Sequence, residues 1–172
     1  MDVITQVEQF ATVGLSSVWL WVGNFLVLVV LTVALLMFAM RGGRSALISL
    51  ILALYGGYAI YIVFPYTEAI VAAGGTQLIQ AVLSIMLFAA ATFGPFILIR
   101  RITSGGFGTL SFVPNLLLAF LTASFLLALG YHVFDISNIY SFPAPLDNLF
   151  APKGYFFWWF IAPLLGLFVL AR

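Results

Sequence analysis

Residues 18–64 read VWLWVGNFLVLVVLTVALLMFAM (18–40), RGGR (41–44) and SALISLILALYGGYAIYIVF (45–64), and this stretch decides the fold. Each apolar run is long enough to cross the hydrocarbon core of a bilayer, which takes roughly 20 helical residues. The four residues between the runs are arginine and glycine, a composition typical of a tight polar turn. The stretch therefore predicts two transmembrane helices joined by a short turn.

Three further apolar runs follow, at 78–99, 110–134 and 155–171. The last is marginal, because it is only about 17 residues long and contains Pro163. We predict an all-α, polytopic integral membrane protein with four or five transmembrane helices, five being favoured. The chain (1–172) is expected to form one membrane domain, with an outer loop at 135–154. Residues 1–17 are expected to form an amphipathic segment at the interface or an outward extension of the first span.

The composition agrees with a lipid-facing surface. The chain is 65% hydrophobic and only 6% charged, whereas a soluble domain has about 25% charged residues. A formal net charge of +1 excludes a nucleic-acid partner, because phosphate binding needs clustered Lys and Arg. The absence of cysteine excludes disulfides and thiolate metal sites. The lipid bilayer is thus the partner that the composition predicts.

The basic residues predict the orientation. Short cytoplasmic loops are enriched in Lys and Arg. A five-span layout puts every arginine on one side and every acidic residue on the other, with Lys153 as the basic exception. This arrangement predicts an outside N-terminus, an inside C-terminus, and five cytoplasmic arginines: Arg41, Arg44, Arg100, Arg101 and Arg172.

Small side chains recur at every fourth position of the second span, as Ser45, Ser49, Ala53 and Gly57. On a helix these residues form one narrow stripe. In lipid, such stripes let two helix backbones approach closely. We therefore expect the stripe to pack against another helix, either of this chain or of another subunit, whereas Ile60 is expected to face lipid. A weaker repeat of the same kind is formed by Ala90 and Gly94.

No catalytic, cofactor-binding or metal-binding residues are expected. No acidic or basic residue lies deep inside a span, whereas proton relays and ion pathways usually need such groups. His132 and Asp135 share a helix face, but a metal site needs three or four ligands. Intramembrane Ser and Thr can bond the carbonyl four residues earlier in their own helix. The sequence therefore predicts a protein that is not an enzyme.

The outer segment 137–153 contains three prolines, which predict an extended or turn-rich loop. Tyr140, Phe142, Leu146 and Phe150 are unusual in a solvated tether. These side chains are expected either to contact a protein partner or to pack on the chain's own helices.

The sequence Arg41-Gly42-Gly43-Arg44-Ser45-Ala46-Leu47-Ile48-Ser49-Leu50, between a first span and a small-residue second helix, resembles the colicin V production protein family. Arg100 and Arg101, followed by the glycines of 105–108, match the family's basic residue and turn before the fourth helix. The likeness extends over about residues 18–134. The chain departs from the family by an added fifth apolar segment and by lacking the acidic and basic residues that usually follow the third-helix glycines.

The resemblance implies a small bacterial inner-membrane protein linked to peptide export or envelope homeostasis, without catalytic activity. Two functions are expected, of which only the first follows from the resemblance. The first is a transport, secretion or envelope accessory that acts in an oligomer, through its membrane helices and outer loop. The second is a structural subunit of a larger membrane complex.

Overall fold

The computed structural model describes residues 23–103, 112–134, 136 and 139–170, and these contain only helices and their connections. The helices are α2 (Leu26–Val63), α3 (Thr67–Ala72), α4 (Gln77–Thr103), α5 (Phe112–His132), α6 (Ala144–Phe150) and α7 (Lys153–Leu170). Four of them, α2, α4, α5 and α7, are long and apolar enough to cross a membrane. The predicted all-α membrane fold is confirmed.

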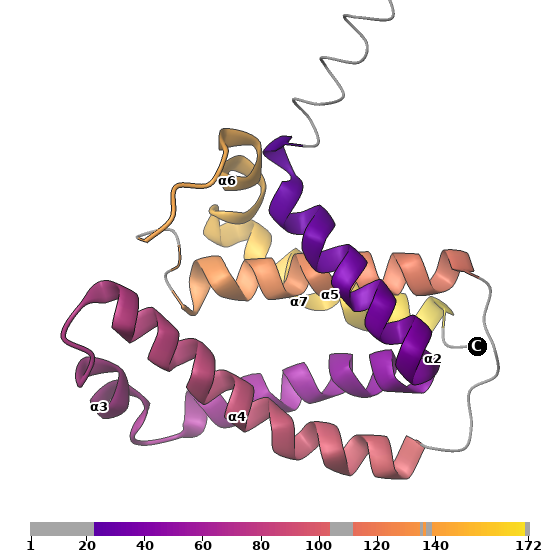
Figure 1. Cartoon of the computed structure of the whole chain (residues 1–172), viewed down its shortest axis with the longest axis horizontal. Helices are drawn as coiled ribbons and strands as arrows, with labels where there is room; N and C mark the ends of the chain where they lie inside the picture. Colours follow the sequence, from indigo (N-terminus) through magenta and orange to yellow (C-terminus); the bar gives the residue numbers. More distant parts are fainter. Residues whose placement is uncertain (1–22, 104–111, 135, 137–138, 171–172) are drawn as a thin grey trace, which may run out of the picture.

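The long helix α2 consists of two arms that meet at Gly43. Its φ of 77° lies in the left-handed region, which favours glycine. Gly42 is also required, because a Cβ there would lie 2.8 Å from the Cβ of Ala46. Figure 1 shows the arms, residues 26–42 and 44–63, diverging from this point as a V. The arms correspond to the first two predicted spans, so five membrane crossings result if each arm crosses.

The fifth apolar run forms one continuous helix, α7, which begins two residues before the expected Tyr155. Pro163 lies inside it and does not break it. Membrane helices tolerate proline when neighbouring helices supply the packing, and Pro163 is buried. Residues 171 and 172 lie outside the described residues.

The outer loop differs from the extended segment that its prolines predicted. It contains α6, which begins directly after Pro143 and has Pro145 in its first turn. Proline suits this position because the first N–H groups of a helix have no partner within the helix. The sequence also did not predict α3, which follows the second arm of α2.

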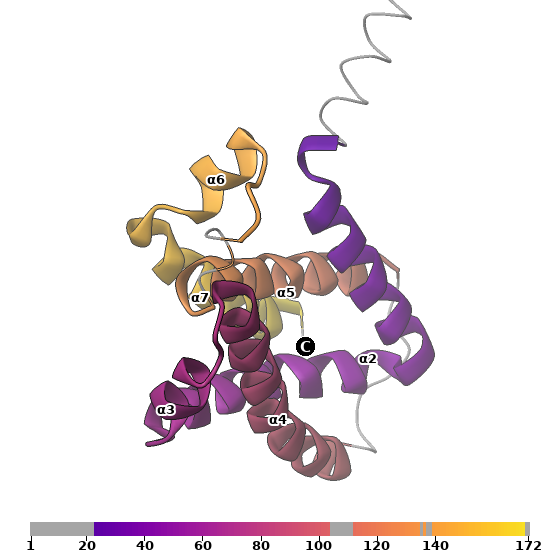
Figure 2. The same cartoon turned by 60° about the vertical axis from the view of Figure 1, so that its left-hand side comes forward.

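Helix α5 is the centre of the bundle. Half of the residues in its most apolar 18-residue stretch are buried, compared with 11–17% in the other three long helices. It packs against both α2 and α7. Small residues permit the close approach: Ala119, Ala123, Ser124 and Ala128 are completely buried. Figures 1 and 2 show α4 crossing the second arm of α2 on another side of the molecule.

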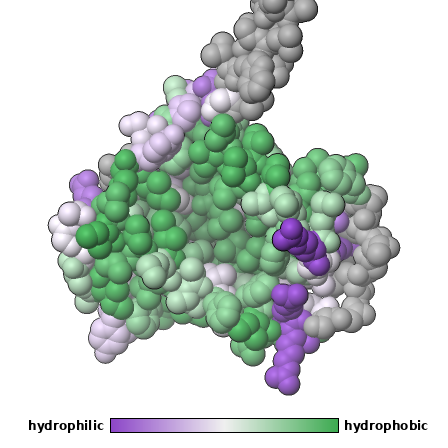
Figure 3. Space-filling view, viewed as in Figure 1, coloured by the Kyte–Doolittle hydropathy of each residue, from purple (hydrophilic) through white to green (hydrophobic). Residues whose placement is uncertain are grey.

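The outer surface is strongly apolar. Figure 3 shows hydrophobic side chains over the middle of one face and hydrophilic ones towards its edges. Met40, Val63, Met86 and Val169 are each at least 64% exposed. Soluble monomers rarely expose such large contiguous apolar surfaces. This surface is suited to the bilayer interior.

Candidate functional site

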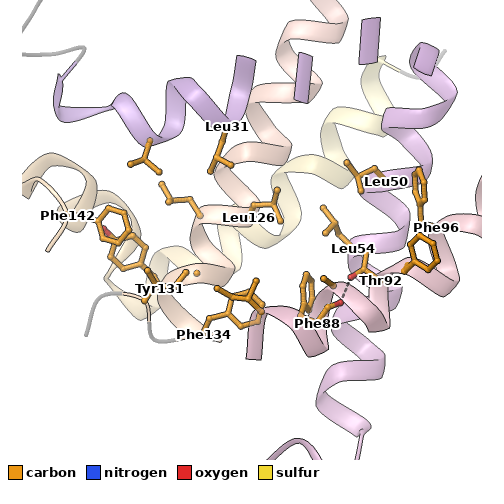
Figure 4. A pocket seen from close by; sticks show the side chains of 17 residues that line it. Leu31, Leu50, Leu54, Phe88, Thr92, Phe96, Leu126, Tyr131, Phe134 and Phe142 are labelled. Carbon is orange, nitrogen blue, oxygen red and sulfur yellow. Dashed lines mark hydrogen bonds between the residues drawn. The ribbon is translucent and has the colours of Figure 1, made fainter. Parts of the chain in front are cut away.

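The described part of the chain contains an apolar cleft of about 630 Å³. Both arms of α2 line it, together with α4 and α5, and it is open to the surface. Figure 4 shows its side chains converging from these helices. The residues are almost all aliphatic or aromatic, and they include Leu31, Leu54, Phe88, Ala89, Phe96, Leu126 and Phe134.

Divergence of the α2 arms creates the cleft, and contacts with α4 set its limits. At one contact, α4 lies tightly against the second arm, where Gly57 meets Thr92. Thr92 also lines the cleft, and its hydroxyl donates to Phe88 O at 2.8 Å. At the arginine-bearing end, the rings of Phe38 on the first arm and Phe96 on α4 are 6.2 Å apart.

A second hollow, of about 430 Å³, adjoins the Phe38–Phe96 pair. Arg41 and Arg100 both line this hollow, together with apolar side chains of the first arm. The guanidinium of Arg100 lies 5.8 Å from the centre of the Phe96 ring, which is cation–π geometry. Two positive side chains from different helices therefore flank one pocket, which we call the basic pocket.

The small-residue stripe of the second arm packs on α4 of the same chain. Ser49 and Ala53 are completely buried, and Ser45 is half-buried. The Ser49 hydroxyl lies 2.8 Å from the Thr103 hydroxyl of α4. A Cβ at Gly57 would lie 2.8 Å from the Thr92 Cα. The stripe is therefore occupied within the chain.

The expected cytoplasmic arginines have different environments. Arg41, Arg100 and Arg101 are exposed. Arg44, by contrast, is buried, and its Nη2 donates to the Leu170 carbonyl at the C-terminal end of α7. This bond places a positive charge at the negative end of the α7 dipole. Nothing in the sequence pattern distinguished Arg44 from the other arginines, and Arg172 lies outside the described residues.

At the opposite end, α6 is held to the chain's own helices. The Tyr131 hydroxyl donates to Asp147 Oδ1 at 2.6 Å, and His132 Nε2 lies 2.8 Å from the Phe150 carbonyl. Leu146 and Phe150 of α6 are completely buried. Leu146 and Phe150 therefore pack on the chain's own helices, which is one of the two arrangements expected for the outer loop.

Phe142 and Tyr140 of the outer loop have different environments. The ring of Phe142 lies tilted beside that of Tyr131, with ring centres 5.0 Å apart, whereas Tyr140 is 55% exposed. Asp135, expected to share a helix face with His132, lies outside the described residues. Among the residues that the structure describes, no three His, Cys, Asp or Glu side chains are grouped as metal ligands.

Hydroxyl groups at membrane depth are bonded to their own helices. Ser49 and Thr103 lie within hydrogen-bonding distance of the carbonyl four residues earlier and also of each other, at 2.8 Å. In four further cases the donor is a buried Ser or Thr and the acceptor is the carbonyl four residues earlier: Thr32, Thr92, Thr122 and Ser124. This local bonding satisfies the hydroxyl without a partner from elsewhere.

Protein-family models, curated proteins and solved structures were compared with the chain, and none of them matches. The resemblance to the colicin V production family therefore stays a prediction from the motif around residues 41–50. The geometry of the cleft and of the basic pocket is therefore the evidence that bears on function.

Proposed function

We propose that this chain is a small, non-catalytic protein of the bacterial inner membrane that serves transport, secretion or the envelope as an accessory component of an oligomer. Support for a non-catalytic role comes from the sequence, in which no acidic or basic residue lies deep inside a span. The inner-membrane assignment relies on the motif resemblance. The proposal of an oligomer is based on an exposed strip of α4 that contains small residues.

The observation that carries the proposal is a lipid-facing strip of α4 with small residues at its centre. Met86, Ala90, Gly94 and Leu98 are four residues apart and all exposed. A Cβ at Gly94 would have no neighbour within 4 Å. At Gly57, the matching space is already filled by Thr92. Small residues promote helix association in lipid, so Ala90 and Gly94 provide a contact point for a helix of another subunit.

The test is the mass of the protein in mild detergent, measured by light scattering with the detergent subtracted. A homogeneous oligomer is expected. Recovery only together with other proteins would favour a structural subunit of a larger complex, and a monomer would contradict both functions. Gly94→Leu should shift the mass towards monomer. Ala59→Leu is the control, because Ala59 is exposed on the second arm of α2, away from this strip.

A further inference from the structure

The apolar cleft and the basic pocket are next to each other, and together they have the polarity of a phospholipid. The cleft is lined almost wholly by hydrocarbon. The basic pocket has Arg41 on one helix and Arg100 on another. Between them lies the Phe38–Phe96 pair, of which Phe96 lines the cleft and Phe38 lines the basic pocket.

Along α4 the cleft has about the depth of one leaflet of the bilayer, and it continues at the opposite end to Phe134, Ile136 and Phe142. Along α4 the cleft extends from Ile85 to Phe96, about 16 Å at the helical rise of 1.5 Å per residue. Half of a hydrocarbon core about 30 Å thick is about 15 Å. The arginines lie just beyond Phe96, at the depth where arginine side chains reach the headgroups.

We propose that this composite site binds one anionic phospholipid, with an acyl chain in the apolar cleft and the phosphate between Arg41 and Arg100. Guanidinium groups are good ligands for phosphate oxygens, which they can bind through two parallel hydrogen bonds. Basic pockets between membrane helices are known to suit anionic headgroups.

The charge of the composite site favours a lipid over a transmembrane helix as the occupant. Phosphate oxygens complement the guanidinium groups of Arg41 and Arg100, which line the basic pocket, whereas an apolar helix offers them no negative charge. The cleft volume of about 630 Å³ is in the range of small-molecule sites.

The experiment uses the full chain in mild detergent with either dioleoyl phosphatidylglycerol or dioleoyl phosphatidylcholine. Native mass spectrometry then counts the lipids that the protein retains. We expect one retained phosphatidylglycerol and weaker retention of phosphatidylcholine. In the double variant Arg41→Gln/Arg100→Gln, the affinity for phosphatidylglycerol should fall about 30-fold, from about 1 kcal/mol for each arginine. Arg101→Gln is the charge control, because Arg101 does not line the basic pocket.

The apolar half of the site is tested by filling the cleft. Ala89→Phe should abolish retention of the lipid, and Leu31→Trp is a second filling variant from the other wall. Ala59→Phe is the matched control, since Ala59 is exposed at membrane depth outside the cleft. Circular dichroism and thermal unfolding identify any variant that fails to fold, and only folded variants are compared.

Three results would overturn the proposal. Equal retention of both lipids by the wild type and by the double arginine variant would remove the headgroup site. Displacement of phosphatidylglycerol by inorganic phosphate would show a site for a free anion. A changed oligomer mass in Ala89→Phe, with lipid retention intact, would show that a helix of a second copy occupies the cleft.

Discussion

Gly57 provides the sharpest test of how the second arm of α2 packs on α4. A Cβ at this position would lie 2.8 Å from the Cα and 2.9 Å from the Cβ of Thr92. The obstacle includes backbone, so a rotamer change of Thr92 does not relieve it. Optimal carbon–carbon contacts lie at about 3.5–4.0 Å, so Gly57→Ala must push the two helices apart by about 1 Å.

The expected cost follows from this separation. Overpacking in a close-packed contact costs about 1–3 kcal/mol. The separation also strains the hydrogen-bonding contact between the Ser49 and Thr103 hydroxyls, which are 2.8 Å apart. Alanine also has a higher helix propensity than glycine. The stabilisation that results offsets part of the destabilisation caused by the clash. A second glycine of a membrane helix is therefore needed as a reference.

Gly154→Ala in α7 supplies that reference. A Cβ at Gly154 meets nothing within 4 Å, so this variant gains helix propensity without a clash. Unfolding is followed by circular dichroism in mixed micelles as the fraction of sodium dodecyl sulfate rises. The free energy of unfolding should be about 1–3 kcal/mol lower for Gly57→Ala than for Gly154→Ala. Ile60→Leu, at a 47% exposed position, should resemble the wild type. Equal stability of the two alanine variants would refute the packing described for the stripe.

Two further predictions concern the ends of the bundle. Phe150→Ala should lower the free energy of unfolding by about 3 kcal/mol, because a completely buried ring is lost, whereas Tyr140→Ser should leave stability unchanged. Protease sensitivity of the outer loop reports this difference, and equal cleavage of the two variants would argue against the docking of α6. Arg44→Gln should weaken the attachment of α7, because the Leu170 carbonyl loses its charged donor, whereas Arg101→Gln should be silent. Hydrogen exchange of the α7 amides would show this, and unchanged exchange in Arg44→Gln would count against the bond.

The elements that the sequence predicted well are those fixed by local chemistry. Apolar length determines which segments suit the bilayer, and Gly43 marks the turn because few other residues adopt its backbone conformation. The stripe containing Ser49 and Gly57 was visible from its spacing. Its neighbour was not, because every face of a membrane helix is apolar and the pattern does not show which face meets which helix.

The remaining features depend on the three-dimensional arrangement. The apolar cleft exists because the α2 arms diverge at Gly43, and the angle between them is not encoded by any local motif. Arg41 and Arg100 are far apart in sequence and meet only once α4 packs beside α2. The helix α6 was missed because the prolines were interpreted as breakers, although Pro143 and Pro145 stand where a helix begins.

The central claim is that α2 crosses the membrane twice and that α4, α5 and α7 each cross once. The chain contains no cysteine, so single cysteines can be labelled without background. We propose four variants, Asp2→Cys, Gly75→Cys, Ile102→Cys and Ala151→Cys, produced in intact bacterial cells and treated with a membrane-impermeant maleimide. Gly75 and Ala151 are exposed between helices at the acidic end, and Ile102 is 84% exposed near the arginines.

The account predicts labelling of positions 2, 75 and 151 from outside and labelling of position 102 only after the cells are opened. Positions 2 and 75 decide the number of crossings made by α2, since two crossings put them on the same side. Labelling of these two positions from opposite sides would contradict the account.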